Sequence, residues 1–295
     1  MKYLVATALL VACKSNEKPA GPQPTDVVVV KPGAQPLRAI RYAVPKGMHT
    51  TVELATDWKV TAGEIGNVMP TIVTSFAIEC DDVAKDGSMK LRARVIDATA
   101  HERADSGVAP AAIATVLEPL KGSTMSLTLA PDGRVSPPTF EAATGSGSGG
   151  NGSSGSAAGS GALTEQLQAL GASFQQLAMP LPTAPIGVGA EWRTSRKIQQ
   201  NGLELTSVTT LDVTSLDATT VGFTLASELH GADQTLTQAG MEVEIKDVVG
   251  TATGKGTIDL AKGVTTGEIH LDLKSNMNAA GSSTPMRAQT DIVIH

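Results

Sequence analysis

The stretch MKLRARV, residues 89–95, carries the pattern that decides the fold of this chain. Apolar side chains stand at every second position from Met89 to Val95, and the positions between them are basic. Because successive side chains of a β-strand point to opposite faces, this period of two predicts a strand with one apolar and one solvated face. Strands of this kind are typical of antiparallel sheets that cover a core with one side only.

The same alternation recurs along the chain, and turn signals separate its segments. Asp86-Gly87, Asp132-Gly133 and Asn201-Gly202 favour tight hairpins, because both residues of each pair tolerate positive φ. Lys262-Gly263 is a weaker signal of the same kind. We therefore expect a mainly β (α+β) fold, a curved antiparallel sheet or half-barrel meander of about ten strands. The other alternating segments are residues 125–129, 221–225, 241–245 and 269–273.

Residues 162–178 differ from the rest because their apolar positions follow a helical period. Spacings of 4, 3, 4 and 3 residues place one apolar stripe on an amphipathic helix, which Pro180 and Pro182 end. A Gly/Ser-rich stretch, 144–161, precedes the helix and predicts a flexible loop. We expect the helix on the concave side of the sheet, with its stripe facing a ligand. The stripe consists of Leu163, Leu167, Leu170, Phe174 and Leu177.

The amino terminus has the features of a secretion signal that ends at a cysteine, which makes residues 1–12 a signal peptide. Tyr3–Ala12 is apolar or small throughout, long enough for a signal core and too short to cross a bilayer. Leu10-Val11-Ala12-Cys13 resembles the bacterial lipobox. That resemblance implies cleavage after Ala12, diacylglycerol on the Cys13 sulfur and an acyl chain such as palmitate on the new amine. The alternative is a chance cysteine behind an ordinary signal.

The residues that follow Cys13 indicate where an anchored chain would reside. Lys14, rather than Asp, comes next, and resemblance to the sorting rule of Gram-negative lipoproteins then favours the outer membrane over the inner one. The following stretch is polar and rich in Pro, so it cannot bury enough surface to fold by itself. We expect residues 13–36 to be a lipidated tether in the cell envelope.

The rest of the chain, 37–295, is expected to form a single β-rich domain with two halves, 37–140 and 180–295. Loop 144–161 and helix 162–178 join the halves. A short likeness between residues 127–135 and 258–264 would fit two repeats of one meander, and a chance match of short strand–turn–strand patterns explains it equally well.

A proline- and glycine-containing segment opens the second half. Residues 182–192 read PTAPIGVGAEW, the pattern Pro-x-x-Pro-[VI]-Gly-x-Gly-x-x-Trp. This segment resembles an uncharacterised family of β-rich bacterial lipoproteins, a domain of unknown function. The resemblance covers 37–295, its specific residues lie in 180–202, and it implies no particular activity. A curved sheet with one helix is also similar to the half-barrels of envelope lipid and lipoprotein carriers, which is an analogy of fold alone.

We find no pattern of residues typical of catalysis, and we predict no catalytic residue, metal site or cofactor. The five histidines are scattered without zinc-ligand spacing. His270 and Asp272 share one strand face, which we interpret as an exposed face. Cys80 is a lone thiol once Cys13 carries lipid. It is interpreted as a small buried residue at a strand end, and a nucleophile would require a histidine nearby in space.

Three hypotheses about function remain open. The first is a membrane-anchored, non-enzymatic envelope lipoprotein that binds a hydrophobic or amphiphilic ligand between sheet and helix. The second is a periplasmic or surface protein–protein interaction module without a ligand cavity, and the third is an enzyme, which we predict the chain is not. A net charge of −6 lacks the basic footprint that nucleic acid requires. The expected partners are therefore the membrane, through Cys13, and a lipid or other apolar ligand.

Overall fold

The computed structural model describes residues 26–141, 171, 178–200, 203–238, 241–279 and 282–295. Strands dominate these residues, as the alternating pattern predicts. They are β1 (Asp26–Lys31), β2 (His49–Ala62), β3 (Ile65–Val68), β4 (Thr71–Val83), β5 (Met89–His101), β6 (Thr124–Leu129), β7 (Thr139–Glu141), β8 (Glu191–Gln200), β9 (Leu203–Leu216), β10 (Thr220–Gly231), β11 (Gln234–Gln238), β12 (Met241–Asp259), β13 (Val264–Ala279) and β14 (Ser282–Ile294).

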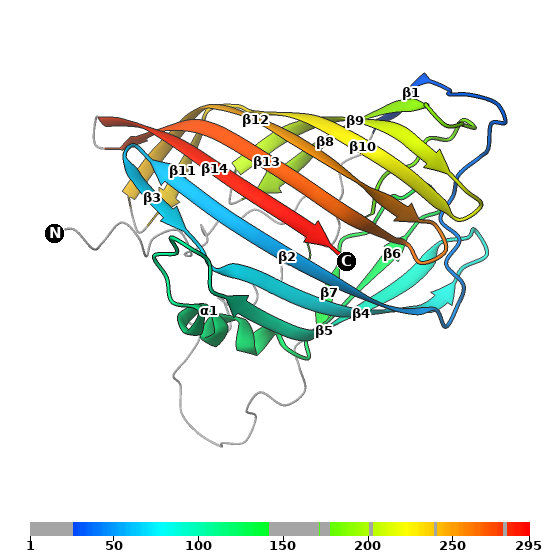
Figure 1. The fold of residues 1–295 in the computed structure, drawn as a ribbon, viewed down its shortest axis with the longest axis horizontal. Helices are drawn as coiled ribbons and strands as arrows, with labels where there is room; N and C mark the ends of the chain where they lie inside the picture. Colours follow the sequence, from blue (N-terminus) through cyan, green and yellow to red (C-terminus); the bar gives the residue numbers. More distant parts are fainter. Residues whose placement is uncertain (1–25, 142–170, 172–177, 201–202, 239–240, 280–281) are drawn as a thin grey trace, which may run out of the picture.

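All of these strands belong to one antiparallel sheet in the order β1-β8-β9-β10-β12-β13-β14-β2-β4-β5-β6-β7, with β11 paired to β12 and β3 paired to β2. The path ends at β1 and β7, so the sheet is open, and Figure 1 shows that it is strongly curved. The predicted fold class is confirmed, with fourteen strands instead of about ten. The last strand, β14, lies beside β2, which joins the two halves of the chain into one sheet (Figure 1).

Strand β1 lies within the stretch 13–36 that the sequence predicts to be a tether. It pairs with β8, and its side chains of Val27 and Val29 contact the core. The cause is the run of four valines from Val27 to Val30, since β-branched side chains favour the extended backbone. The tether prediction did not anticipate this strand.

The predicted turns lie between paired strands. Gly87, Gly133 and Gly263 have φ of 83°, 84° and 69°, the left-handed conformation that glycine adopts without strain. Strands β8 and β9 pair as far as Gln200 and Leu203, so Asn201-Gly202 connects them, although this dipeptide lies outside the described residues.

The inner face of β12 is lined with small residues where the sheet bends. A Cβ on Gly256 would lie 2.2 Å from the carbonyl oxygen of Thr266, and one on Gly254 would lie 2.5 Å from that of Glu268. Strands β12 and β13 therefore approach more closely than side chains would permit. Glycine in a strand interior often marks a tight bend of this kind.

The apolar face of the sheet forms two separate clusters. The larger one, which we call the large core, contains fully buried Phe76, Leu129, Trp192 and Ile258. The smaller one, the small core, is built mainly on the other ends of β9 to β13. Its buried members are Leu205, Leu229, Val243, Ile245, Val248 and Leu273.

Segments 37–46 and 178–190 cross one end of the sheet, which we call the capped end. The backbone N–H of Tyr42 donates to Pro131 O (2.9 Å), and that of Leu181 donates to Asp132 O (2.8 Å). The Tyr42 hydroxyl donates to Met179 O (3.2 Å) and accepts from Met179 N (3.1 Å). Trp192 Nε1 donates to Pro180 O (3.2 Å). These bonds fix both segments over the large core.

The proline- and glycine-containing segment 182–192 forms part of the capped end. Ile186 exchanges two backbone hydrogen bonds with Arg38, at 2.7 and 2.8 Å, and its side chain is fully buried. A Cβ on Gly187 would lie 1.8 Å from Ala34 O, so only glycine permits this approach of two backbones. The residues that carry the family resemblance therefore have a structural role.

The main described helix is α1 (Pro110–Leu117), followed by the short 3₁₀ turn η2 (Glu118–Leu120), and α1 buries Ile113 and Leu117 in the large core. The sequence pattern did not reveal α1 because it is short and rich in alanine. The predicted helix 162–178 lies outside the described residues except for Gly171, which is helical and lies against Pro138 and Phe140, and Ala178. No described helix is long and apolar enough to cross a membrane.

Candidate functional site

One register row crosses the inner face of seven strands midway between the two cores. Its members are directly paired, strand by strand, from β8 through β9, β10, β12, β13 and β14 to β2. On β10, for example, Ser227 of this row lies between Leu225 of the large core and Leu229 of the small core. We call it the middle row. It consists of Thr194, Thr209, Ser227, Ala252, Leu271, Thr290 and Trp58.

The β8–β10 part of the middle row is polar. Thr194 and Ser227 are buried, as is Ser207, which lies on the same face of β9 two residues before Thr209. The Thr209 hydroxyl is hydrogen-bonded to the Ser227 hydroxyl and lies 3.3 Å from Ser207 Oγ. Buried hydroxyls are normally hydrogen-bonded, and those of Ser207, Thr209 and Ser227 bond to one another. They form a polar band that separates the two hydrophobic cores.

Arg196 lies beside this polar band on the inner face of β8. It follows Thr194 by two residues and stands directly opposite Ser207. Within the described part of the chain, no hydrogen bond or ion pair holds its guanidinium. Burial lowers the pKa of Arg196, and no neighbouring acid opposes this effect. Because arginine keeps its proton in proteins, the site presents a partly desolvated cation.

The β13–β2 part of the middle row is largely apolar and incompletely covered. Leu271 and Trp58 are only partly buried, although they lie well inside long strands. Ile269 and Ile292, one row nearer the capped end, are also partly buried. The inner face thus keeps accessible apolar surface between two well-packed clusters.

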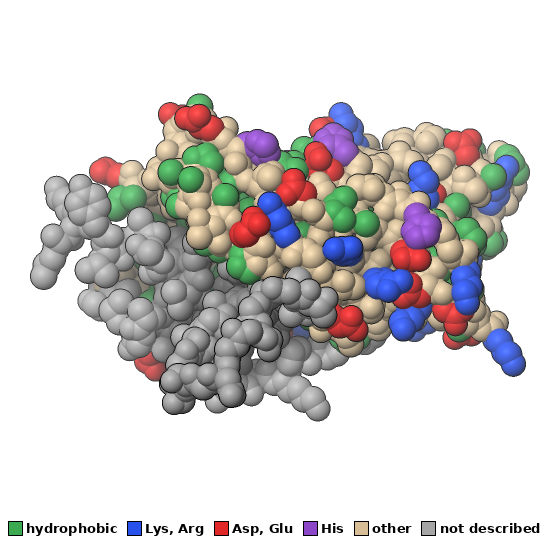
Figure 2. Space-filling model, turned by 90° about the horizontal axis from the view of Figure 1, so that it is seen from below, with side chains coloured by type: hydrophobic (Ala, Val, Ile, Leu, Met, Phe, Trp, Pro, Cys, Tyr) green, Lys and Arg blue, Asp and Glu red, His purple; other side chains and the backbone are tan. Residues whose placement is uncertain are grey.

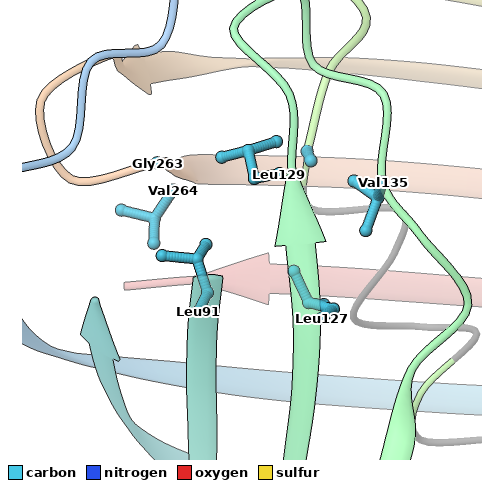
Figure 3. A pocket seen from close by; sticks show the side chains of 7 residues that line it. Leu91, Leu127, Leu129, Val135, Gly263 and Val264 are labelled. Carbon is cyan, nitrogen blue, oxygen red and sulfur yellow. The ribbon is translucent and has the colours of Figure 1, made fainter. Parts of the chain in front are cut away.

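A small pocket lies under the capped end (Figure 3). Its volume is about 10 Å³, close to the space that one water molecule needs and far below that of a ligand site. The side chains from β5 and β6 point toward those of the β12–β13 turn across it. This pocket is therefore too small to hold a ligand of lipid size. The lining residues are Leu91, Leu127, Leu129, Val135, Ala178, Gly263 and Val264.

The structure does not describe the predicted lipidation site, Cys13, or the cleavage site, Ala12. The predicted ligand-facing stripe also lies outside the described residues: Leu163, Leu167, Leu170, Phe174 and Leu177.

Cys80 is buried near the end of β4 in the large core, as its interpretation as a small apolar residue predicts. Its sulfur lies 3.9 Å from Val44 O and 3.6 Å from Asp82 O. Burial raises the pKa of the Cys80 thiol, so the protonated form is favoured. This environment is that of a structural cysteine rather than an activated nucleophile.

His270 and Asp272 lie on the outer face of the sheet and do not form a pair. His270 contacts Asp291, directly opposite on β14. Asp272 accepts two hydrogen bonds from the Arg287 guanidinium, at 2.8 and 2.7 Å, which lower the pKa of its carboxyl. The interpretation as an exposed face is confirmed. Figure 2 shows that acidic, basic and histidine side chains are interspersed on one face of the molecule, without a large area of one sign.

The inward-facing arginine and hydroxyls were missed at the sequence level. The stretch EWRTSRKIQQ, residues 191–200, contains a signal that these side chains point inward. Thr194 and Arg196 follow Trp192 by two and four residues, so they lie on the same face of the strand as the buried indole. Polar residues at core positions of a strand are exceptions to binary patterning and point to function.

Part of the chain matches a known family model. No curated protein and no solved structure matches the chain. Residues 164–265 match the model of a family of unknown function, DUF6263. This range includes the distinctive segment 182–192, the whole polar band and Arg196, and it supports the predicted resemblance to an uncharacterised domain family.

Proposed function

We propose that this protein is a membrane-anchored envelope lipoprotein without enzymatic activity that binds a hydrophobic or amphiphilic ligand on the inner face of its sheet. The observation that carries this proposal is the partly buried apolar surface of the middle row at Leu271 and Trp58. Covering apolar surface releases about 25 cal/mol per Å², so an acyl chain laid along these side chains would bind favourably. Because the large core and the small core are both well packed, we expect the acyl chain in the region between them.

The anchoring part of the proposal rests on the amino terminus. The lipobox-like residues before Cys13 support cleavage after Ala12 and lipid attachment at Cys13, and Lys14 favours the outer membrane. Strand β1 begins at Asp26. Even fully extended, residues 14–25 would span at most about 43 Å. A short tether of this kind would keep the sheet close to the bilayer that supplies an apolar ligand.

The predicted helix 162–178 supplies the second wall of the proposed site. Its apolar stripe, Leu163, Leu167, Leu170, Phe174 and Leu177, would face the ligand from the side opposite the sheet. Gly171, which the structure describes, lies against Phe140 of β7 at one edge of the sheet.

A protein–protein interaction module is the second candidate, and one observation favours it. The pocket at the capped end has a volume of only about 10 Å³, which is too small for a ligand of lipid size. The two proposals differ in what covers the middle row, which is either an apolar small molecule or protein.

Native mass spectrometry of the full chain carrying Cys13→Ser, purified without detergent, separates these candidates. We expect a protein–lipid complex that releases a lipid mass on activation. A protein that carries no lipid and takes up none after incubation with oleate would favour the interaction module. Fractionation of cells that express the parent chain or the Cys13→Ser variant tests the anchor. We expect Cys13→Ser to move the protein out of the membrane fraction. Retention at the level of the parent chain would place the anchor elsewhere.

A further inference from the structure

We propose that Arg196, together with the hydroxyls of Ser207 and Thr209, binds the anionic head group of a single-chain amphiphile whose tail lies along the middle row toward Trp58. This inference rests on the proposed function and specifies its ligand.

The charge of the site favours an anion. Arg196 is partly buried on the inner face, and no described carboxylate pairs with it. A desolvated cation without a counter-charge is costly, and a bound oxyanion removes that cost. The planar guanidinium matches a carboxylate or a phosphate, the two common anionic ends of lipid molecules. The lowering of the Arg196 pKa by burial alone agrees with the absence of a protein partner among the described residues.

The hydroxyls beside Arg196 have a hydrogen to donate. Ser207, Thr209 and Ser227 carry three hydroxyl hydrogens, and two hydrogen bonds join the three groups. One hydrogen therefore remains for a further acceptor. Since Ser207 stands directly opposite Arg196, a ligand oxygen at the guanidinium would also lie next to this hydroxyl chain. The site thus offers a cation and a neutral donor to the same oxyanion.

The direction of the tail follows from the composition of the row. From Ser227 the row continues through Ala252 and Leu271 to Thr290 and Trp58, with small or apolar side chains except for one threonine. Four interstrand steps of about 4.8 Å give a path of about 19 Å, the length of a long acyl chain. Gly250 and Gly254, two residues before and after Ala252 on β12, have no side chains that would obstruct this path. The middle row is one side chain wide, so it has room for a single acyl chain.

The test compares oleate with methyl oleate, which has the same tail and no charge, using the full chain with Cys13→Ser. Arg196→Gln is expected to weaken oleate binding by about tenfold or more, because it removes a charge-assisted hydrogen bond, and to change methyl oleate binding by less than about twofold. Arg193→Gln is the matched control, since Arg193 lies on the same strand but is exposed on the outer face. It should bind both ligands like the parent chain.

Lysophosphatidate, which carries a phosphate on a single tail, should compete with oleate, and inorganic phosphate should not, because it lacks the tail. Arg196→Lys keeps the positive charge and should retain the preference for oleate over methyl oleate. It also serves as the test if Arg196→Gln fails to fold. Any one of three results would overturn this inference and leave the proposed function standing. The parent chain could bind oleate and methyl oleate equally, Arg196→Gln could bind oleate as the parent chain does, or inorganic phosphate could displace oleate. Binding of neither ligand by the parent chain would overturn both.

Discussion

The capped end and the middle row are two parts of the same inner face, built on many of the same strands, yet they are packed in opposite ways. At the capped end, segments 37–46 and 178–190 lie across the sheet, and Trp192 is 0% exposed beneath them. On the middle row, Trp58 remains partly buried and Arg196 lacks a described partner. Strand pairing alone therefore does not make a core. A covering segment must supply the second layer, and over the middle row we expect it from the predicted helix 162–178 together with a ligand, or from a protein partner.

Truncation of the buried indole of Trp192 tests the packing of the capped end. Trp192→Ala should lower the free energy of unfolding by about 3–5 kcal/mol, since it removes a fully buried indole and leaves a cavity. Trp58→Ala should cost clearly less, because part of this side chain already contacts solvent. Urea unfolding of both variants measures the difference. Equal losses would mean that the middle row is packed as tightly as the capped end.

A smaller effect is expected at the hydrogen bonds that hold the cap. Tyr42→Phe should cost about 1–3 kcal/mol, because the N–H and the carbonyl of Met179 lose their shared partner in a buried place. Segment 178–190 should then become easier to detach from the sheet. Hydrogen exchange of the Leu181 amide, which donates to Asp132 O, reports this directly. Unchanged protection would show that Tyr42 does not hold the cap.

The same tyrosine predicts a dependence on pH. Burial raises the pKa of the Tyr42 phenol above its ordinary value of 10.0, so the folded state holds this proton more tightly than the unfolded state. The stabilisation that results is complete below pH 10 and is lost as the pH rises toward the folded pKa. The parent chain should therefore lose stability above pH 10 more steeply than Tyr42→Phe. Parallel stability curves for the two proteins would contradict this prediction.

The smallest effect concerns the outer face, directly behind the middle row. Asp272 follows Leu271 in β13 and is held by Arg287, which lowers the pKa of its carboxyl. A lowered pKa gives stability that is present above the unfolded value and is lost as the pH falls through the folded one. Asp272→Asn should thus lower Tm slightly at neutral pH, and the difference should vanish in acid. Because its side chain points away from the inner face, ligand binding should remain unchanged.

Much of the fold follows from local sequence signals. Period-two alternation identifies β5, β6, β10 and parts of β12 and β13, and glycines such as Gly87 and Gly263 mark the turns. Strand order does not follow from such signals. The pairing of β14 with β2 joins Thr290 to Trp58 across most of the chain, and a local pattern carries no information about a partner so distant.

The candidate site was harder to predict than the fold for a related reason. The row from Thr194 to Trp58 exists only once seven strands are aligned in register, and each of its residues is unremarkable in its own strand. Thr194 and Arg196 read as ordinary polar positions until the phase of Trp192 shows that they point inward. The lipobox-like residues around Cys13 are the opposite case, because a contiguous motif is visible without a structure.

Tryptophan fluorescence with a dibrominated stearate can show whether an apolar chain binds along the middle row. Bromine quenches an indole only at close range, and Trp58 and Trp192 are the two tryptophans of the chain. We predict saturable quenching of the parent chain that is absent from Trp58→Phe, because Trp192 lies fully buried under the cap. Quenching of equal size in Trp58→Phe, or no quenching of the parent chain at saturating ligand, would show that the apolar chain does not bind beside Trp58.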